Sequence, residues 1–361
     1  MQIALDLLVW MLMLALSGKA ADENSLSAVI RSFGSFVVLF LRSNGYLHRG
    51  GHPDRFGSGG GADFVMPVPE AYGLPGSLTD YLPDPFEPVD RWFQARNASN
   101  VRTTVRIVQD LCPGADLFVD PLAGGGSSAC AARLLGVSFF GLELDPVLAC
   151  VSLAKSTATA RHARADPLWR VTPDQDDPVA SCLDVTRRLS AGTDRPVSRA
   201  DMLDDLERNA PAPTLPLVLW ADATQPDVWD ELHAEARHAV LYTSPPFGLS
   251  SPRPQASPEL YADAVTALAS AEAARAESGP AKFASYEELA ADVVVNAARR
   301  LGHVTAVLEH EPADDGSDAR ESTVRLLLDS LGNRVKSLRI LECGAYSRRG
   351  MFSLIVCEVV P

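Results

Sequence analysis

From about residue 91 to its end, the chain alternates short apolar runs with segments of helical periodicity. The apolar runs are Asp116–Val119, Ser138–Leu142, Leu215–Trp220, Ala239–Tyr242, Val304–Leu308, Lys336–Leu341 and Met351–Val359. Runs of this length, separated by helices, predict strands of one α/β sheet with helices on both faces. The first five strands are expected to be parallel, since crossovers connect them. The short segment Gly344–Gly350 predicts an antiparallel hairpin at the sheet edge.

Two long segments interrupt this alternation and are expected to be inserts in a domain spanning 66–361. Residues 156–213 hold eight Arg and ten Asp or Glu, which is typical of a mixed-charge accessory segment. Residues 249–284 are first rich in Ser and Pro and then rich in Ala. Both are expected near the carboxyl ends of strands, where open α/β sheets bind ligands.

Residues 1–65 are expected to form a helical and linker extension. Ile3–Leu16 is almost entirely apolar, but it contains Asp6, lacks a basic start and is too short to span a bilayer. An amphipathic or buried helix is the favoured interpretation, and a signal peptide is an alternative. A third interpretation is that translation starts at Met66, after the linker-like run Gly57–Gly61.

The acidic composition limits the kinds of partner that the chain can have. It has 32 Lys and Arg against 46 Asp and Glu, a net charge of −14. This excludes a protein that binds polyanions over its whole surface, because phosphate binding depends on positive charge. A local basic groove on an acidic body is still compatible with it.

The six cysteines show no Cys-x-x-Cys spacing and no accompanying His pattern. Neither a metal site nor a disulfide framework is therefore expected. The prediction is buried, reduced thiols in a cytoplasmic protein. A mean hydropathy of +0.03 excludes a multi-span membrane protein, and no membrane partner is expected.

A glycine-rich turn follows the first strand, in Asp116-Leu-Phe-Val-Asp-Pro-Leu-Ala-Gly-Gly-Gly-Ser-Ser128. Glycines allow a tight turn close to a ligand, and the helix that follows offers free N–H groups. The Gly-x-Gly-x-x-Gly of a general dinucleotide turn is absent. The segment instead resembles the cofactor motif of amino-group methyltransferases, with Leu122 replacing the usual Phe. The cofactor contacts that this resemblance implies are Asp120, Pro121, Ala123, Gly124, Gly126 and Ser127.

Acidic residues follow the next two strands. Glu143, about 20 residues after the glycine turn, stands where a ribose diol is held in such sheets, and Asp145 is the second candidate. The resemblance assigns Asp222, after the third strand, to the adenine amino group of the cofactor. A helix N-cap is the alternative role for Asp222.

The fourth strand ends in Leu241-Tyr-Thr-Ser-Pro-Pro-Phe-Gly248, which resembles the catalytic motif of amino-group methyltransferases. An exocyclic amino nitrogen is a poor nucleophile because its lone pair is delocalised. Hydrogen bonds from its N–H groups to the Ser244 hydroxyl and the Pro245 carbonyl would favour a tetrahedral nitrogen. Pro245 and Pro246 fix the backbone, and Phe247 would stack on the planar substrate. Thr243, just before Ser244, is assigned to the cofactor.

An upstream segment, Arg91-Trp-Phe-Gln-Ala-Arg-Asn-Ala98, resembles the Trp-x-Ala-Arg segment of some bacterial DNA methylases. Asn97 departs from the usual proline. The resemblance implies that Trp92 and Phe93 help to close the methionine end of the cofactor site. Ordinary aromatic packing before a helix is the alternative.

Over roughly residues 91–361, the chain thus resembles S-adenosylmethionine-dependent DNA amino-methyltransferases. The implied fold is a seven-stranded Rossmann-like sheet, mostly parallel, with an antiparallel C-terminal hairpin. Serine at position 244 is typical of cytosine-N4 enzymes, so methylation of cytosine in DNA is the leading hypothesis. Transfer would be direct, with no metal.

Three features disfavour a routine restriction-modification enzyme: the order of the two motifs, the lack of sequence beyond the seventh strand for target recognition, and the net charge of −14. Arg253, Arg348 and Arg349 are the candidates for contacts with a DNA backbone. A base of RNA, or an Asn or Gln side-chain amide of a protein or peptide, is the alternative substrate. A non-catalytic module with the methyltransferase fold is the second alternative.

Overall fold

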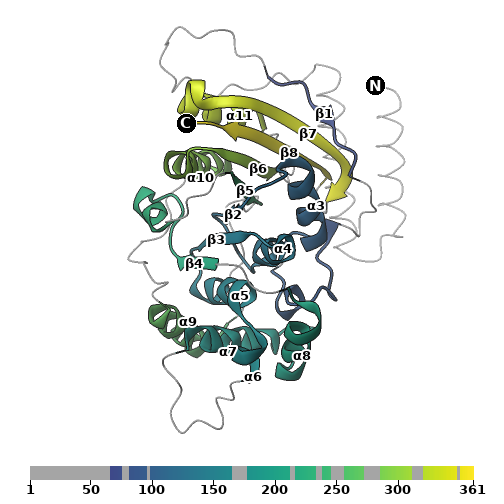
Figure 1. Cartoon of the computed structure of the whole chain (residues 1–361), viewed down its shortest axis with the longest axis vertical. Helices are drawn as coiled ribbons and strands as arrows, with labels where there is room; N and C mark the ends of the chain where they lie inside the picture. The colour runs from purple at the N-terminus through teal and green to yellow at the C-terminus, as the bar shows by residue number, and fades with distance from the viewer. Residues whose placement is uncertain are drawn as a thin grey trace, which may run out of the picture. The chain divides into compact units, whose positions relative to one another are not determined.

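The computed structural model describes residues 66–74, 81–95, 98–164, 177–211, 216–232, 238–244, 256–271, 285–310, 320–347 and 350–361. All of them belong to one compact unit, Phe64–Pro361 (Figure 1). The extension predicted for residues 1–65 lies outside the described residues. The division into domains therefore stays a prediction.

The described strands form one eight-stranded sheet in the order β1-β7-β8-β6-β5-β2-β3-β4. The strands are β1 (Glu70–Ala71), β2 (Leu117–Asp120), β3 (Ser138–Glu143), β4 (Pro216–Trp220), β5 (Ala239–Thr243), β6 (Val304–His310), β7 (Val335–Ser347) and β8 (Gly350–Val359). β2 to β6 pair in parallel, and β8 is antiparallel to both β6 and β7. The predicted parallel core and antiparallel C-terminal hairpin are confirmed.

Two details of the sheet differ from the prediction. β1 lies where no strand was predicted, and it pairs in parallel with β7, with Glu70 opposite Leu341. β1 has only two residues, too few for a periodic pattern to show in the sequence. β7 runs on to Ser347, through part of the predicted turn, with a bulge before Tyr346.

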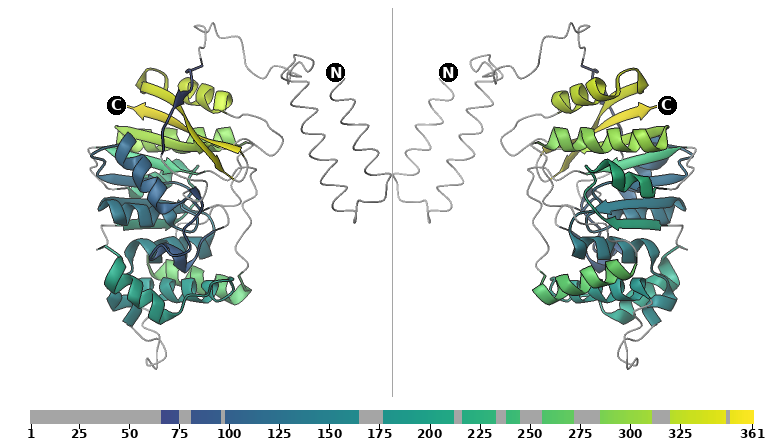
Figure 2. Two further views of the ribbon diagram at one scale, coloured as in Figure 1. Left: turned by 90° about the vertical axis from the view of Figure 1, so that its right-hand side faces the viewer. Right: turned by 90° about the vertical axis from the view of Figure 1, so that its left-hand side faces the viewer.

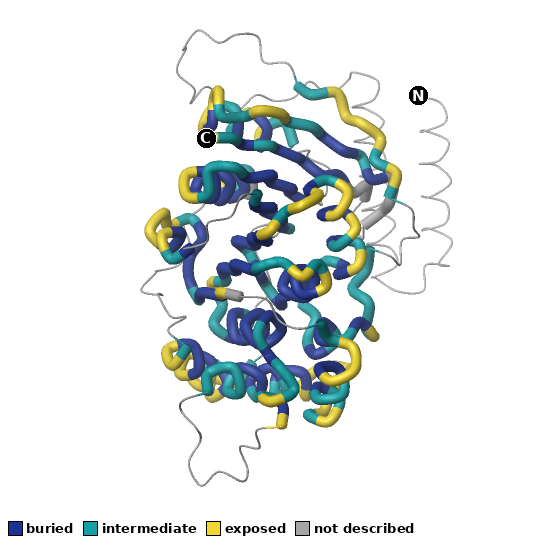
Figure 3. Tube along the Cα trace, in the orientation of Figure 1, coloured by how far each residue is buried: buried dark blue, intermediate teal, exposed yellow. Residues whose placement is uncertain are grey.

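The sheet is buried on both faces, as expected for parallel strands between helices. The helices are α3 (Val101–Leu111), α4 (Ser127–Leu135), α5 (Pro146–Thr157), α6 (Ala160–Arg164), α7 (Pro178–Ser190), α8 (Arg199–Asp204), α9 (Pro258–Ser270), α10 (Tyr286–Leu301) and α11 (Arg320–Leu331). Phe118 of β2 belongs to the buried cluster that contains residues of α3, α4 and α5, whereas Leu117 and Val119 belong to the cluster that contains residues of α10 and α11. The predicted helices on both faces are confirmed, and Figure 3 shows the buried strands between them.

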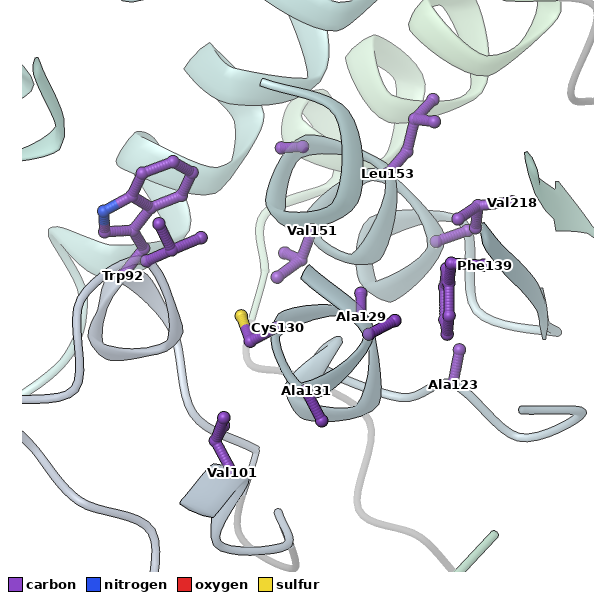
Figure 4. Close-up of a cluster of buried hydrophobic side chains, with 14 of the residues drawn as sticks. Trp92, Val101, Ala123, Ala129, Cys130, Ala131, Phe139, Val151, Leu153 and Val218 are labelled. Atoms are coloured by element: carbon purple, nitrogen blue, oxygen red, sulfur yellow. The ribbon is translucent and has the colours of Figure 1, made fainter. Parts of the chain in front are cut away.

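Helix α4 follows the glycine turn, and its small side chains explain how closely it packs. Ala129, Cys130 and Ala131 are buried between the sheet and neighbouring helices (Figure 4). Phe139 of β3 lies beside Ala123 of the turn in the same cluster. The glycine turn is therefore built on a tightly packed base.

The described parts of the two inserts are mainly helical. α7 and α9 pack on α5 and on each other, at the end of the sheet away from β7 and β8 (Figure 2). The start of α9 also reaches the carboxyl edge of the sheet, because the Tyr261 hydroxyl donates to Asp145 just after β3. α7 instead forms a further layer behind α5, and not a cover over the strand ends.

All six cysteines are free and buried, as predicted for the thiols. Cys150 and Cys182 approach each other, with 3.3 Å between their sulfur atoms. Within the described ranges, no helix combines the length and the apolar character needed to cross a membrane.

Candidate functional site

The predicted site residues of four strands meet at one edge of the sheet. β5, β2, β3 and β4 are consecutive neighbours and run parallel, so their carboxyl ends lie side by side. Asp120 ends β2 and Glu143 ends β3, while Thr243 ends β5 and Ser244 follows it. Asp222 comes two residues after β4. Residues between positions 120 and 244 of the sequence thus share one edge.

The Glu143 carboxylate is held by backbone N–H groups on both oxygens. Gly124 N donates to Oε2 at 2.7 Å, and Asp145 N donates to Oε1 at 2.8 Å. Burial raises the pKa of Glu143 to about 7, and these two donors only partly offset that effect. The glycine turn and the end of β3 are therefore joined through one carboxylate that titrates near neutrality.

Asp120 is a second buried carboxylate at this edge, with 6% of its surface exposed. Leu122 N donates to its Oδ1 at 3.0 Å. Burial raises the pKa of Asp120 to about 6, while the hydroxyls of Ser128 and Thr243 and the Leu122 N–H act to lower it. β2 pairs in parallel with β5, with Val119 opposite Leu241, so Asp120 and Thr243 lie at neighbouring strand ends.

The glycine turn needs glycine at two places for different reasons. Gly126 has a φ of +78°, and a Cβ there would lie 2.9 Å from Ser152 Cα. A Cβ on Gly125 would lie 3.2 Å from Ala95 N. Gly126 is thus fixed by packing against α5. Gly125 is fixed by residues 87–95, here called the lead-in segment, which cross the turn at Phe93 and Ala95.

Ser127, predicted to contact a cofactor, is 6% exposed and is the first residue of α4. Its hydroxyl donates to Asp90 Oδ1 at 2.9 Å. The structure therefore gives this side chain a protein partner on the lead-in segment. Pro121 and Ala123 are buried within the turn, and Gly124 is partly exposed.

Asp145 and Asp222 both organise the backbone beside the site. Asp145 caps α5, with Oδ1 accepting from the N–H groups of Val147 and Leu148. Asp222 is 5% exposed, and its Oδ1 accepts from the N–H and the hydroxyl of Thr224. Asp222 thus orders the loop after β4 through one oxygen.

The two aromatic residues predicted to close the site have different surroundings. A Cβ on Gly125 would lie 3.7 Å from Phe93 Cδ1, so Phe93 lies over the glycine turn. Trp92 is fully buried, and its Nε1–H donates to Asp205 at 2.9 Å. Packing and a hydrogen bond to the first insert therefore account for Trp92, which is the alternative named above.

Several predicted residues lie outside the described residues: Pro245, Pro246, Phe247, Asn97, Arg253, Arg348 and Arg349. Ser244 is described and is partly exposed at the end of β5. Two residues earlier, the buried Tyr242 hydroxyl donates to Glu309 at the end of β6. Ser99 also donates to Glu309, at 3.2 Å.

Sequence reasoning missed the buried charges behind the site. Lys155 of α5 and Asp90 of the lead-in are fully buried and form an ion pair. A lysine within an otherwise apolar helix was the available signal, in a chain that has only four lysines. Over the described ranges, His, Cys, Asp and Glu side chains form no group of three suited to a metal ion.

No protein-family model matches the sequence, and no curated protein matches it. The chain is similar to solved structures at low identity. An rRNA methylase from Streptococcus thermophilus is 10% identical over 72% of this chain and 97% of that chain, with a TM-score of 0.35. The rRNA methyltransferase aviRa from Streptomyces viridochromogenes is 16% identical over 75% and 89%, with a TM-score of 0.34.

A third solved structure is magnesium protoporphyrin IX methyltransferase from Synechocystis PCC 6803. It is 10% identical over 72% of this chain and 81% of that chain, with a TM-score of 0.35. Similarity at this level leaves the function to be argued from the chain's own residues.

Proposed function

We propose that the chain is an S-adenosylmethionine-dependent methyltransferase acting on an exocyclic amino group, with cytosine N4 in DNA as its leading substrate. The convergence of four strand ends carries this proposal. The glycine turn, Glu143, Asp222 and Ser244 are separated in sequence but share one edge of a parallel sheet. Open α/β sheets bind their ligands at this edge.

The charged groups at this edge fit the proposed cofactor. The ribose hydroxyls and the adenine amino group of S-adenosylmethionine are donors, and Glu143 and Asp222 offer carboxylate acceptors. We assign Glu143 to the ribose and Asp222, through Oδ2, to the adenine. When bound, the cofactor supplies a methyl group on a positively charged sulfur, and the buried Asp120 carboxylate adds negative charge nearby.

Ser244 is the residue we assign to the amino group of the substrate. Its hydroxyl would accept a hydrogen bond from the amino N–H, together with the Pro245 carbonyl, and so localise the nitrogen lone pair. Phe247 would stack on the base, as enzymes acting on flipped bases require. The nitrogen gains the methyl group and releases one proton to water, so no covalent enzyme intermediate is needed.

The experiment is methyl transfer from labelled S-adenosylmethionine to unmethylated DNA, total RNA and a protein extract. Wild type is compared with Ser244→Ala, and Ser198→Ala serves as control because Ser198 caps the exposed start of α8. Label in N4-methylcytosine that Ser244→Ala alone abolishes would support the proposal. No transfer together with no cofactor binding would refute it in favour of a non-catalytic module.

A side-chain amide of a protein or peptide is the second candidate substrate, and the charge distribution favours it. In the described part of the chain, many arginines already pair with carboxylates. These pairs are Arg91–Asp205, Arg102–Glu87, Arg106–Asp110, Arg164–Glu207, Arg187–Asp184, Arg188–Asp263, Arg208–Asp204, Arg320–Glu342 and Arg325–Glu321. Paired arginines contribute less positive potential for phosphates. Label in methylated Asn or Gln would favour this substrate over DNA.

A further inference from the structure

A fully buried ion pair lies directly behind the glycine turn. Lys155 Nζ donates to Asp90 Oδ1 at 2.8 Å, and neither side chain is exposed to solvent. The other oxygen, Asp90 Oδ2, accepts from Gln94 Nε2 at 3.0 Å. Removing two charges from water offsets much of their mutual attraction, so stability alone is a weak explanation for the pair.

The pair connects three segments of the chain: residues 90–95, α4 and α5. Asp90 also accepts from Ser127 at the start of α4, while Lys155 belongs to α5. Lys155 Nζ makes a second bond, to the Phe93 carbonyl at 2.6 Å. The lead-in segment is thereby tied across the glycine turn, where Ala95 N and Phe93 approach Gly125.

The backbone that brings Asp90 to this place is strained. Val89 has a φ of 67° and a ψ of −50°, and Asp90 N donates to Pro88 O at 2.8 Å, which together define a γ-turn with positive φ. β-branched residues rarely adopt this conformation, so the backbone at Val89 is strained. Asp205 of the first insert accepts from Val89 N, Arg91 and Trp92, and so holds the other side of the turn.

We infer that Asp90 and Lys155 are positioning residues for the cofactor: they hold residues 90–95 across the glycine turn, so that cofactor affinity depends on this buried pair. The inference rests on the proposed function, because the glycine turn is there assigned to S-adenosylmethionine. The strained backbone at Val89 and the hydrogen bonds to Asp205 then help to hold the same segment in place. Together they place the Phe93 carbonyl and Ala95 against the turn before any ligand arrives.

The test compares wild type, Lys155→Met and the double variant Asp90→Asn/Lys155→Met. Calorimetry with S-adenosylhomocysteine measures cofactor affinity. Amide hydrogen exchange over 89–95 and 123–127 measures how stably these segments are ordered when no cofactor is bound. Lys155→Met is expected to weaken binding about 10- to 100-fold and to speed exchange about tenfold or more. Its KM for S-adenosylmethionine should rise with kcat little changed.

The double variant separates positioning from stability. Removing both charges should recover part of the lost stability, because no unpaired carboxylate remains buried. The bond from Lys155 to the Phe93 carbonyl stays lost, so affinity should stay low. Affinity that recovers together with stability would overturn the inference.

Arg334→Met is the control for general destabilisation. Arg334, just before β7, is partly buried and donates to the carbonyls of Ala298 and Val360, on the β7 and β8 side of the sheet and not beside the glycine turn. The variant should lose stability while its affinity stays within about twofold of wild type. Equal losses of affinity in Arg334→Met and Lys155→Met would refute positioning.

The two proposals fail in different ways. A wild type that does not bind S-adenosylhomocysteine would overturn the proposed function and, with it, the cofactor role of the pair. A wild type that binds, with exchange over 89–95 and 123–127 unchanged in Lys155→Met, would overturn the positioning inference alone.

Discussion

Cofactor affinity should depend on the ionisation of Glu143. Its pKa is raised to about 7, chiefly by burial, while both its oxygens already accept backbone N–H groups of the turn and of β3's end. Ribose hydroxyls that donate to this carboxylate need its ionised form. Below about pH 7 the carboxyl is protonated, so the affinity for S-adenosylhomocysteine should fall by up to about tenfold for each unit of pH.

The same group has the opposite effect on the stability of the free protein. A carboxyl whose folded pKa is raised above its unfolded value stabilises the fold fully below the unfolded value, near 4.3. That contribution is lost as the pH rises through about 7. Lowering the pH from about 8 to about 6 should therefore weaken binding while the contribution of Glu143 to stability increases.

Glu143→Gln measures how much the Glu143 carboxylate contributes to cofactor binding. The amide keeps the shape but loses a charged acceptor, and hydrogen bonds to charged groups contribute about 1.5–3 kcal/mol. The expected loss is about 10- to 100-fold in affinity, because 1.4 kcal/mol is a factor of ten. One backbone donor is also left facing an NH₂ group, which should lower stability by about 1–3 kcal/mol.

Calorimetric titrations with S-adenosylhomocysteine over this pH range, on wild type and Glu143→Gln, test the reasoning. The wild type should show a midpoint near the raised pKa, and the variant should lose that dependence. Asp120→Asn is the control. Burial raises the pKa of Asp120 only to about 6, so removing this carboxylate should leave the binding midpoint near pH 7 unchanged. An affinity that is constant with pH in wild type, or a dependence that survives Glu143→Gln, would refute the assignment.

Two further predictions concern the base of the site. Gly126→Ala should destabilise the protein by about 1–2 kcal/mol for its positive φ and about 1–3 kcal/mol for the overlap with Ser152. Urea unfolding measures the loss, and Gly192→Ala, whose Cβ would meet only Leu189 O at 3.5 Å, should change little. Tyr242→Phe removes a donor from the buried Glu309 and should cost about 1–3 kcal/mol in thermal unfolding. Unchanged stability in Tyr242→Phe would mean that other donors satisfy Glu309.

The sequence was sufficient for the sheet because its signals are local. Each of the seven predicted runs became a strand, and the Asn100 side chain caps the start of α3. Apolar run length, crossover helices and turn residues are properties of neighbouring positions, so they can be read without knowing the fold. The same holds for the spacing between the glycine turn and Glu143.

What the sequence could not determine depends on contacts between distant positions. Ser127 looked like a ligand residue, yet its partner is Asp90, 37 positions earlier. Lys155 is a lysine in a mostly apolar helix, but only the packing of α5 on the lead-in segment makes it a buried charge paired with Asp90. The two-residue β1 exists because β7 leaves an edge for it to pair with. The sequence by itself thus determined the seven longer strands and the ends of the strands that carry the candidate site residues. Tertiary structure decided which polar side chains face that site and which hold it together, because a side chain's partner is set by whatever the fold brings against it.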